Sequence, residues 1–74
     1  MISYDPFWKT LKEKKISQYT LINKYGFSKG TLDRMKQQEA LNLTSIEQLC
    51  TFLDCPVEKI VKITPDPALL NKKD

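Results

Sequence analysis

The sequence has no histidine, only two cysteines and only two glycines among its 74 residues. Histidine is the usual general base near neutral pH, and no pocket-sized apolar frame surrounds the carboxylates, so the composition argues against an enzyme. With Cys50 and Cys55 as the only thiols, a four-ligand zinc site in one chain would need carboxylates. We therefore expect reduced, structural thiols and no metal or other cofactor; a redox role for Cys55 near Lys59 is the alternative.

Long hydrophobic runs are also lacking. No apolar stretch approaches the roughly 18 residues of a membrane span, and the opening MISYDPFWKT lacks the regions of a signal peptide. We expect a cytoplasmic protein with no membrane partner. A chain of this length forms one domain and buries only about 60% of the surface that its unfolded form exposes.

Charge is divided unevenly along the chain. Residues 1–36 contain eight basic and three acidic residues, a net charge of +5, whereas residues 37–74 contain four basic and six acidic residues, a net charge of −2. A positive half beside a weakly negative half is typical of a protein that binds a polyanion on one side. Simple solvation by surface lysines is the alternative explanation.

The spacing of apolar residues predicts helices throughout, without strand-like alternation. We expect a first helix with Asp5 as its cap and Pro6 at its first position. Ser17 is the predicted cap of a second helix that stops at Gly26, and Ser28 is the predicted cap of a third. A glycine in a turn of about three residues makes two helices cross steeply instead of folding back on each other.

Two more helices are predicted in the second half. Thr44 and Glu47 match a capping box before the apolar pattern of TSIEQLCTFLDC, and a last short helix is expected near Pro56. The prolines and charges of residues 65–74 predict a flexible tail. The fold class is therefore all-α, a compact bundle of five short helices. Its expected core includes the aromatic side chains of Phe7, Trp8, Tyr25, Phe27 and Phe52, whereas Tyr19 falls off the apolar stripe.

The segment SQYTLINKYGFSKGTLDRMKQQ, residues 17–38, resembles the helix-turn-helix of the Cro/CI-type family, the lambda-repressor-like or Xre family of DNA-binding domains. The family's slots are filled in order by Gln18, Leu21, Tyr25, Gly26, Phe27, Leu32 and Met35. The resemblance covers about residues 6–63, because TSIEQLCTFLDCPVEKIV looks like the fourth and fifth helices. It implies a helix-turn-helix domain over residues 1–64, with the motif at about 17–37, that binds double-stranded DNA and regulates transcription as a repressor.

Three positions depart from the family pattern. Ile22 stands where the family usually has alanine, which implies that the two motif helices repack or sit further apart. Lys36 replaces an acid that usually forms a buried pair with a base on the first helix. The glycine that usually follows the recognition helix is missing from KQQEALN. Together these departures indicate a divergent branch.

The resemblance also implies which residues face DNA. Its base-facing slots correspond to Ser28, Lys29, Gly30 and Arg34, with Thr31 and Asp33 beside them. Lys29 and Arg34 suit guanine O6 and N7, whereas Asp33 suits cytosine N4 or orients Arg34. Gly30 would let the helix end approach DNA closely. The predicted phosphate contacts are Ser17, Gln18 and Tyr19 at the first motif helix, and Lys36, Gln37, Gln38 and Asn42 near the exit of the recognition helix.

So few base contacts rarely give useful specificity, so we expect a homodimer on an inverted repeat with half-sites about 34 Å apart. The predicted dimer interface consists of Val57, Ile60, Val61 and Ile63. A monomer assisted by another protein is the alternative assembly. Two other functions stay open: a protein-interaction module, such as an antitoxin or anti-repressor, and a nonspecific nucleic-acid binder. No small-molecule ligand is expected.

Overall fold

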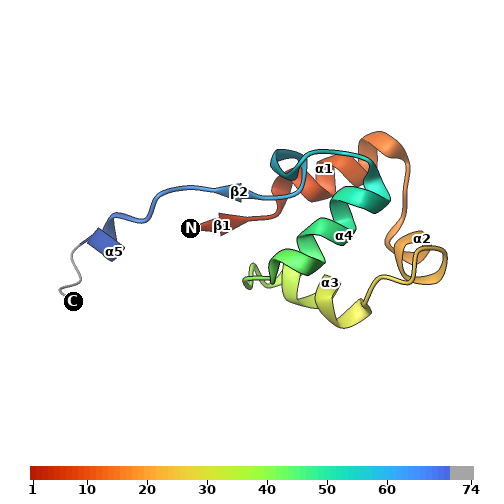
Figure 1. Cartoon of the computed structure of the whole chain (residues 1–74), viewed down its shortest axis with the longest axis horizontal. Helices are drawn as coiled ribbons and strands as arrows, with labels where there is room; N and C mark the ends of the chain where they lie inside the picture. The colour runs from red at the N-terminus through yellow and green to blue at the C-terminus, as the bar shows by residue number, and fades with distance from the viewer. Residues whose placement is uncertain (71–74) are drawn as a thin grey trace.

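Figure 1 shows the computed structural model, which describes residues 1–70, as a helical body with a strand pair and a C-terminal arm. Its elements in chain order are β1 (Ile2–Ser3), α1 (Asp5–Lys14), α2 (Gln18–Asn23), α3 (Lys29–Lys36), α4 (Leu43–Leu53), the 3-10 turn η1 (Val57–Lys59), β2 (Lys62–Ile63) and α5 (Pro67–Leu70). The predicted helical class is confirmed. Residues 71–74, the end of the predicted tail, lie outside the described residues.

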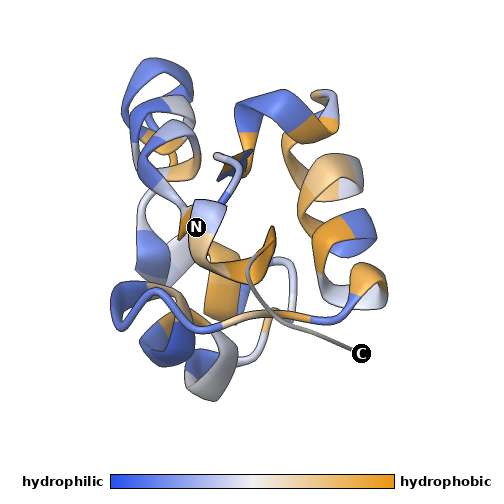
Figure 2. Cartoon of the chain, turned by 90° about the vertical axis from the view of Figure 1, so that its left-hand side faces the viewer, coloured by the Kyte–Doolittle hydropathy of each residue, from blue (hydrophilic) through white to orange (hydrophobic). Residues whose placement is uncertain are grey.

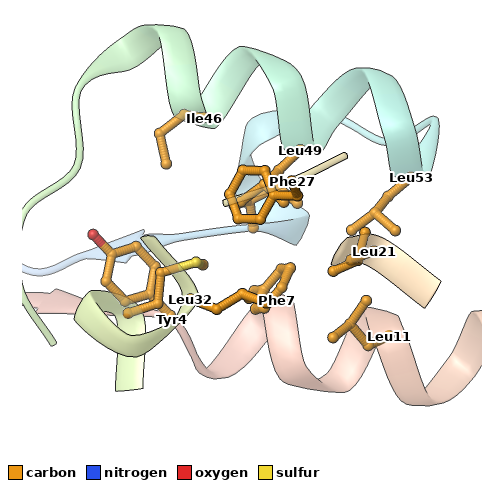
Figure 3. Close-up of a cluster of buried hydrophobic side chains, with 11 residues drawn as sticks. Tyr4, Phe7, Leu11, Leu21, Phe27, Leu32, Ile46, Leu49 and Leu53 are labelled. Atoms are coloured by element: carbon orange, nitrogen blue, oxygen red, sulfur yellow. The ribbon is translucent and has the colours of Figure 1, made fainter. Parts of the chain in front are cut away.

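One shared core receives the apolar face of each main helix. Phe7 and Leu11 of α1 lie opposite Leu49 and Leu53 of α4, and Phe27 reaches between the two helices (Figure 3). Figure 2 shows hydrophobic and hydrophilic segments alternating along the helices, as one apolar face per helix requires. Each large side chain buried in this way contributes about 1.5–3 kcal/mol. The other members of the core are Tyr4, Leu21, Leu32, Met35, Ile46 and Ile60.

The predicted caps of the two motif helices are confirmed. Ser17 Oγ accepts a hydrogen bond from the amide of Thr20 at 3.1 Å, and Ser28 Oγ accepts one from the amide of Thr31 at 3.2 Å. Each hydroxyl satisfies one of the amides that the first helical turn leaves without a partner.

The other two predicted caps are wrong. Asp5 is the first residue of α1, its amide is bound by Ser3 Oγ at 3.2 Å, and the residue at the cap is Tyr4. Helix α4 begins at Leu43, with Asn42 as its cap, because Asn42 Oδ1 accepts from the amide of Ser45 at 2.8 Å. An asparagine that already satisfies this amide leaves Thr44 inside the first turn.

The prediction of helices alone misses the strand pair. β1 and β2 pair antiparallel, with Ile2 opposite Ile63 and Ser3 opposite Lys62. Two-residue strands are too short to leave an alternating pattern, and their pairing joins the two ends of the helical body. The predicted helix at Pro56 is the single turn η1, which Thr10 holds against α1 by donating its hydroxyl to the carbonyl of Lys59 at 2.8 Å.

Three helices end on a left-handed residue that is not glycine. Lys15 after α1, Gln38 after α3 and Asp54 after α4 have φ of 56°, 59° and 49°. At the exit of α3, the amide of Gln38 donates to Met35 O and that of Glu39 to Arg34 O, both at 3.0 Å, which is a Schellman ending. Gln38 therefore takes the conformation that a glycine adopts without strain, and the missing family glycine does not remove the turn.

Tyr4 is a core residue that the sequence patterns did not reveal. Only 1% of its surface is exposed, and its hydroxyl donates to the carbonyl of Glu39 at 2.6 Å. Its amide donates to Gln38 Oε1 at 3.3 Å. Burial raises the pKa of the Tyr4 phenol above its ordinary value of 10.0, although the amide of Leu41 and the charge of Arg34 act in the opposite direction. Tyr4 thereby ties the start of α1 to the exit of α3.

Lys15→Gly should raise the free energy of unfolding by about 0.5–1 kcal/mol, because glycine removes the left-handed strain at an exposed position. Lys12→Gly is the matched control, since Lys12 is exposed but lies within α1; there glycine should lower the free energy of unfolding by about 0.5–1 kcal/mol. Urea denaturation measures both. A loss of stability in both variants would contradict the role assigned to Lys15.

Tyr4→Phe should lower the free energy of unfolding at pH 7 by about 1–2 kcal/mol, because it leaves the carbonyl of Glu39 without its partner. The raised pKa means that the phenol stabilises the fold fully below pH 10.0 and progressively less as the pH rises through the folded-state pKa. The stability difference between wild type and Tyr4→Phe should therefore shrink above pH 10. Tyr19→Phe, at an exposed tyrosine, is the control and should change stability little at either pH.

Candidate nucleic-acid interface

Helices α2 and α3 are joined by residues 24–28, a turn that combines one flexible residue with one buried aromatic side chain. Gly26 has φ of +73°, and no heavy atom lies within 4 Å of the place that a Cβ would occupy, so conformation alone explains the glycine. Phe27 follows it, is 3% exposed and donates its amide to Leu21 O at 2.9 Å. The next residue is the cap of α3, so the turn places the start of that helix directly.

Aromatic contacts fix the turn against α4. The ring of Phe52 on α4 lies 6.4 Å from that of Phe27 in an edge-to-face arrangement and 5.3 Å from that of Tyr25 in a stacked one. Such pairs add about 0.5–1.5 kcal/mol each beyond the area that they bury. Ile22, the residue in place of the family's alanine, is half-buried and packs against the same core.

Helix α3 turns one face inward and the other to solvent. Leu32 and Met35 are completely buried, which leaves the predicted base-facing residues on the outer side. On this side, exposed side chains can donate hydrogen bonds to bases or phosphates from Ser28, Lys29, Arg34 and Lys36. Gly30 and Asp33 are exposed beside them, and Thr31 is half-buried. The structure thus brings the predicted reading residues onto one solvent-facing surface.

Nothing in residues 1–70 requires a glycine at position 30. A Cβ there would meet only Ser28 Oγ, at 3.6 Å, which is an ordinary contact, and Gly30 does not have a positive φ. With the amide of Thr31 bound to Ser28 Oγ and that of Leu32 bound to Ser28 O, the amides of Lys29 and Gly30 remain at the exposed helix start. This end of α3 can approach an anion closely.

Arg34 is held by the segment that follows α3. Its Nη2 donates to the carbonyl of Ala40 at 3.3 Å, and its Nε lies 3.6 Å from Glu39 Oε1. The suggestion that Asp33 orients Arg34 is wrong for this structure, because Asp33 Oδ1 lies 3.9 Å from Lys36 Nζ instead. Both ion pairs are exposed and weak, so DNA phosphates or bases can displace them.

Glu39 is a residue of the candidate interface that sequence reasoning missed. It occupies the position where a Schellman ending usually has an apolar contact with the residue equivalent to Arg34. Here an ion pair replaces that contact. The available signal was an acid five residues after an arginine, across a helix end that no glycine marked.

The predicted phosphate contacts fall into two groups. At the start of α2, Ser17 and Tyr19 are exposed and Gln18 is half-buried, and Ser17 accepts from the amides of Thr20 and Leu21 instead of those of Gln18 and Tyr19. At the exit of α3, Lys36 and Gln37 are exposed. Gln38 and Asn42 are less free than expected, because Gln38 Oε1 accepts from Tyr4 and Asn42 Oδ1 accepts from Ser45.

One member of the predicted dimer interface is excluded. Ile60 is completely buried within its own chain and is unavailable to a partner. Val57 and Ile63 are exposed and Val61 is half-buried, and all three line an apolar groove of about 130 Å³. The prediction for Ile60 is wrong because η1 turns its side chain into the core that α1 and α4 share, which local spacing did not reveal.

The cysteines behave as packing residues. Both are free and half-buried, and burial raises the pKa of each thiol, with Glu58 adding to the effect at Cys50. Lys14 and Lys59 lower the pKa of Cys55, but less than burial raises it. A raised pKa leaves little thiolate near pH 7, which opposes the redox alternative.

Two other features are absent from residues 1–70. No helix there combines the length and apolar character needed to cross a bilayer. Over the same residues, the possible metal-binding side chains do not gather in groups of three.

Comparison with known proteins agrees with this geometry. A family model described as the Cro/C1-type HTH DNA-binding domain matches residues 7–66. A solved structure of the transcriptional regulator VanUg (Form II) superposes with a TM-score of 0.77 and 28% sequence identity, covering 88% of this chain and 87% of that one. No curated protein sequence matches the chain. The turn at Gly26, the buried Phe27 and the match over most of the chain together show that this protein belongs to the Cro/C1-type helix-turn-helix DNA-binding family.

Proposed function

We propose that the protein is a sequence-specific regulator of transcription that reads the major groove of double-stranded DNA with α3. The observation that carries the proposal is the solvent-facing side of α3, where Lys29 and Gly30 of the first turn and Arg34 of the last turn are exposed while Leu32 and Met35 anchor the other side. A major groove about 12 Å wide admits a helix presented in this way. The similarity to VanUg, which its title calls a transcriptional regulator, supports the same function.

The proposed DNA-binding residues divide into readers, which contact bases, and positioners, which contact phosphates. Lys29 and Arg34 have the donors that match guanine O6 and N7, and Arg34 can bind both atoms at once. Gln18 at the start of α2 and Lys36 at the exit of α3 suit phosphates on either side of the groove. Phosphate contacts fix the register of α3 on the DNA, and the two readers then determine which base sequence is bound.

Repression is the simplest outcome of this binding. A protein that occupies a promoter blocks other proteins without any further contact, whereas activation needs a second contact with the transcription machinery. Because one domain offers few base contacts, we propose a homodimer on an inverted repeat, with half-sites about 34 Å apart. Val57, Val61 and Ile63, without the buried Ile60, supply the apolar surface for it.

Selection of duplexes from a random-sequence pool at two salt concentrations tests the function. Recovery of an inverted repeat is the expected result. Enrichment without a motif, with a steep salt dependence, would assign nonspecific binding.

A protein-interaction module is the second candidate. Two acids, Asp33 and Glu39, occupy the reading surface and pair with its cations, which lowers the positive charge that faces DNA. Absence of any duplex binding at about 50 mM salt would favour this candidate, because backbone attraction is strong there.

Arg34→Ala should weaken binding to the selected site by about 1–3 kcal/mol and relax specificity at one base pair, because it removes a reader. Lys36→Ala should weaken binding to specific and random duplexes alike and reduce the salt slope by about one, because it removes a phosphate contact. Titration of both duplexes at several salt concentrations measures the two effects. Equal losses on both duplexes for both variants would contradict this division.

Glu39→Gln is the matched test of the ion pair. It removes the carboxylate that holds Arg34 and should strengthen binding to the selected site. Glu47→Gln removes an exposed acid on α4 instead and serves as the control for net charge. Equal gains in the two variants would show that Arg34 is not restrained by Glu39.

Gly30→Ala should raise stability by about 0.5 kcal/mol, because the structure accommodates the methyl group and alanine favours a helix. It should also weaken binding to the selected site by about tenfold, which corresponds to about 1.4 kcal/mol, if the helix end lies close to DNA. Thermal unfolding and duplex titration on one preparation measure both. Higher stability with unchanged affinity would show that the glycine is incidental.

A further inference from the structure

The C-terminal arm, residues 64–70, extends beyond β2 and carries α5 away from the helical body (Figure 1). Its last two described residues are Leu69 and Leu70, which are 59% and 87% exposed. Figure 2 shows α5 as a hydrophobic segment at the front of the molecule. The turn is already formed, because Asp66 accepts from the amides of Ala68 and Leu69. Two adjacent leucines on a preformed turn form an exposed apolar surface, and burying such a surface against another protein surface is favourable.

An apolar groove lies near the base of this arm. The strand pair, the start of α4 and η1 enclose about 130 Å³, with Ile2, Leu43, Val57 and Ile63 among the walls. These four side chains are exposed in the single chain. The groove therefore offers room for an aliphatic side chain and lies next to residues from which the arm starts.

The arm is built to point away from its own groove. The amide of Thr64 donates to Met1 O at 2.9 Å, and the N-terminal ammonium donates to Thr64 O, which continues the strand pair outward. Pro65 and Pro67 each restrict φ to about −65° and hold the preceding residue in an extended conformation. A chain stiffened at four successive residues does not reverse to cover the groove beside its own base.

We propose that the arm of one protomer docks Leu69 and Leu70 into the apolar groove of a second copy, and that the second copy returns the same contact. This inference rests on the proposed homodimer and specifies how it is held together. The extended chain from Thr64 to Pro67 spans at most about 10–11 Å, and the helical turn of α5 adds about 3 Å up to Leu69. The shorter dimensions of the molecule are 22 and 18 Å, so the arm can reach across more than half of a neighbouring body. A reciprocal exchange of this kind closes a two-fold dimer.

Sedimentation equilibrium of the full chain at micromolar concentrations tests the exchange with two complementary variants. Leu69→Ser with Leu70→Ser removes the arm's side chains, and Leu43→Ser with Ile63→Ser removes exposed walls of the groove. Each double variant should raise the dimer dissociation constant at least tenfold. An equimolar mixture of the two should associate more tightly than either variant alone, because it restores one intact arm facing one intact groove.

The outcomes separate the exchange from the dimer itself. Tyr19→Ser removes another exposed large side chain, away from arm and groove, and should leave association unchanged. A wild type that stays monomeric overturns both the dimer and the exchange. A wild-type dimer that persists in the arm variant and is lost in the groove variant overturns the exchange alone and assigns groove-to-groove packing. Far-UV circular dichroism checks that each variant keeps its helices.

Discussion

The burial of Phe27 is the interaction on which the rest of the structure depends. Its ring sits between α1 and α4 (Figure 3), and its amide closes onto the carbonyl of Leu21. A buried aromatic ring directly after a left-handed glycine gives the chain one direction in which to start α3. Phe52 and Tyr25 reinforce that direction from α4 and from the turn. The orientation of α3 is therefore a consequence of core packing.

The exit of α3 links the same core to the candidate interface. Tyr4 holds the carbonyl of Glu39 from inside the core, and the carboxylate of Glu39 holds Arg34 on the outside. The left-handed Gln38 makes this path possible by reversing the chain between them. Arg34, which we propose as a reader of DNA, is thus restrained by a segment whose position the first strand and first helix determine. Under the proposed function, contacts to bases or phosphates replace this weak, exposed ion pair on binding.

Predictions from short-range patterns succeeded where one or two turns of chain contain the cause. Ser17, Ser28 and Gly26 act on atoms within a few residues, so their roles follow from composition and order. Asn42 shows the limit of this reasoning, because two residues near one helix start could both cap it and the geometry chose the earlier one. The predicted base-facing residues came from the family pattern, and the exposure of most of them follows from the burial of Leu32 and Met35 on the other side of α3.

The amino-acid sequence by itself determined the helical class, the turn at Gly26, the motif caps and the uneven charge, because each arises from local spacing or from composition. Only the tertiary structure decided that Tyr4 and Ile60 are buried, that β1 pairs with β2, and that Glu39 holds Arg34. Most of these contacts join residues far apart in the chain, and the Arg34–Glu39 pair depends on a left-handed residue between its members. Spacing along a sequence carries no information about such contacts until the core has brought the segments together.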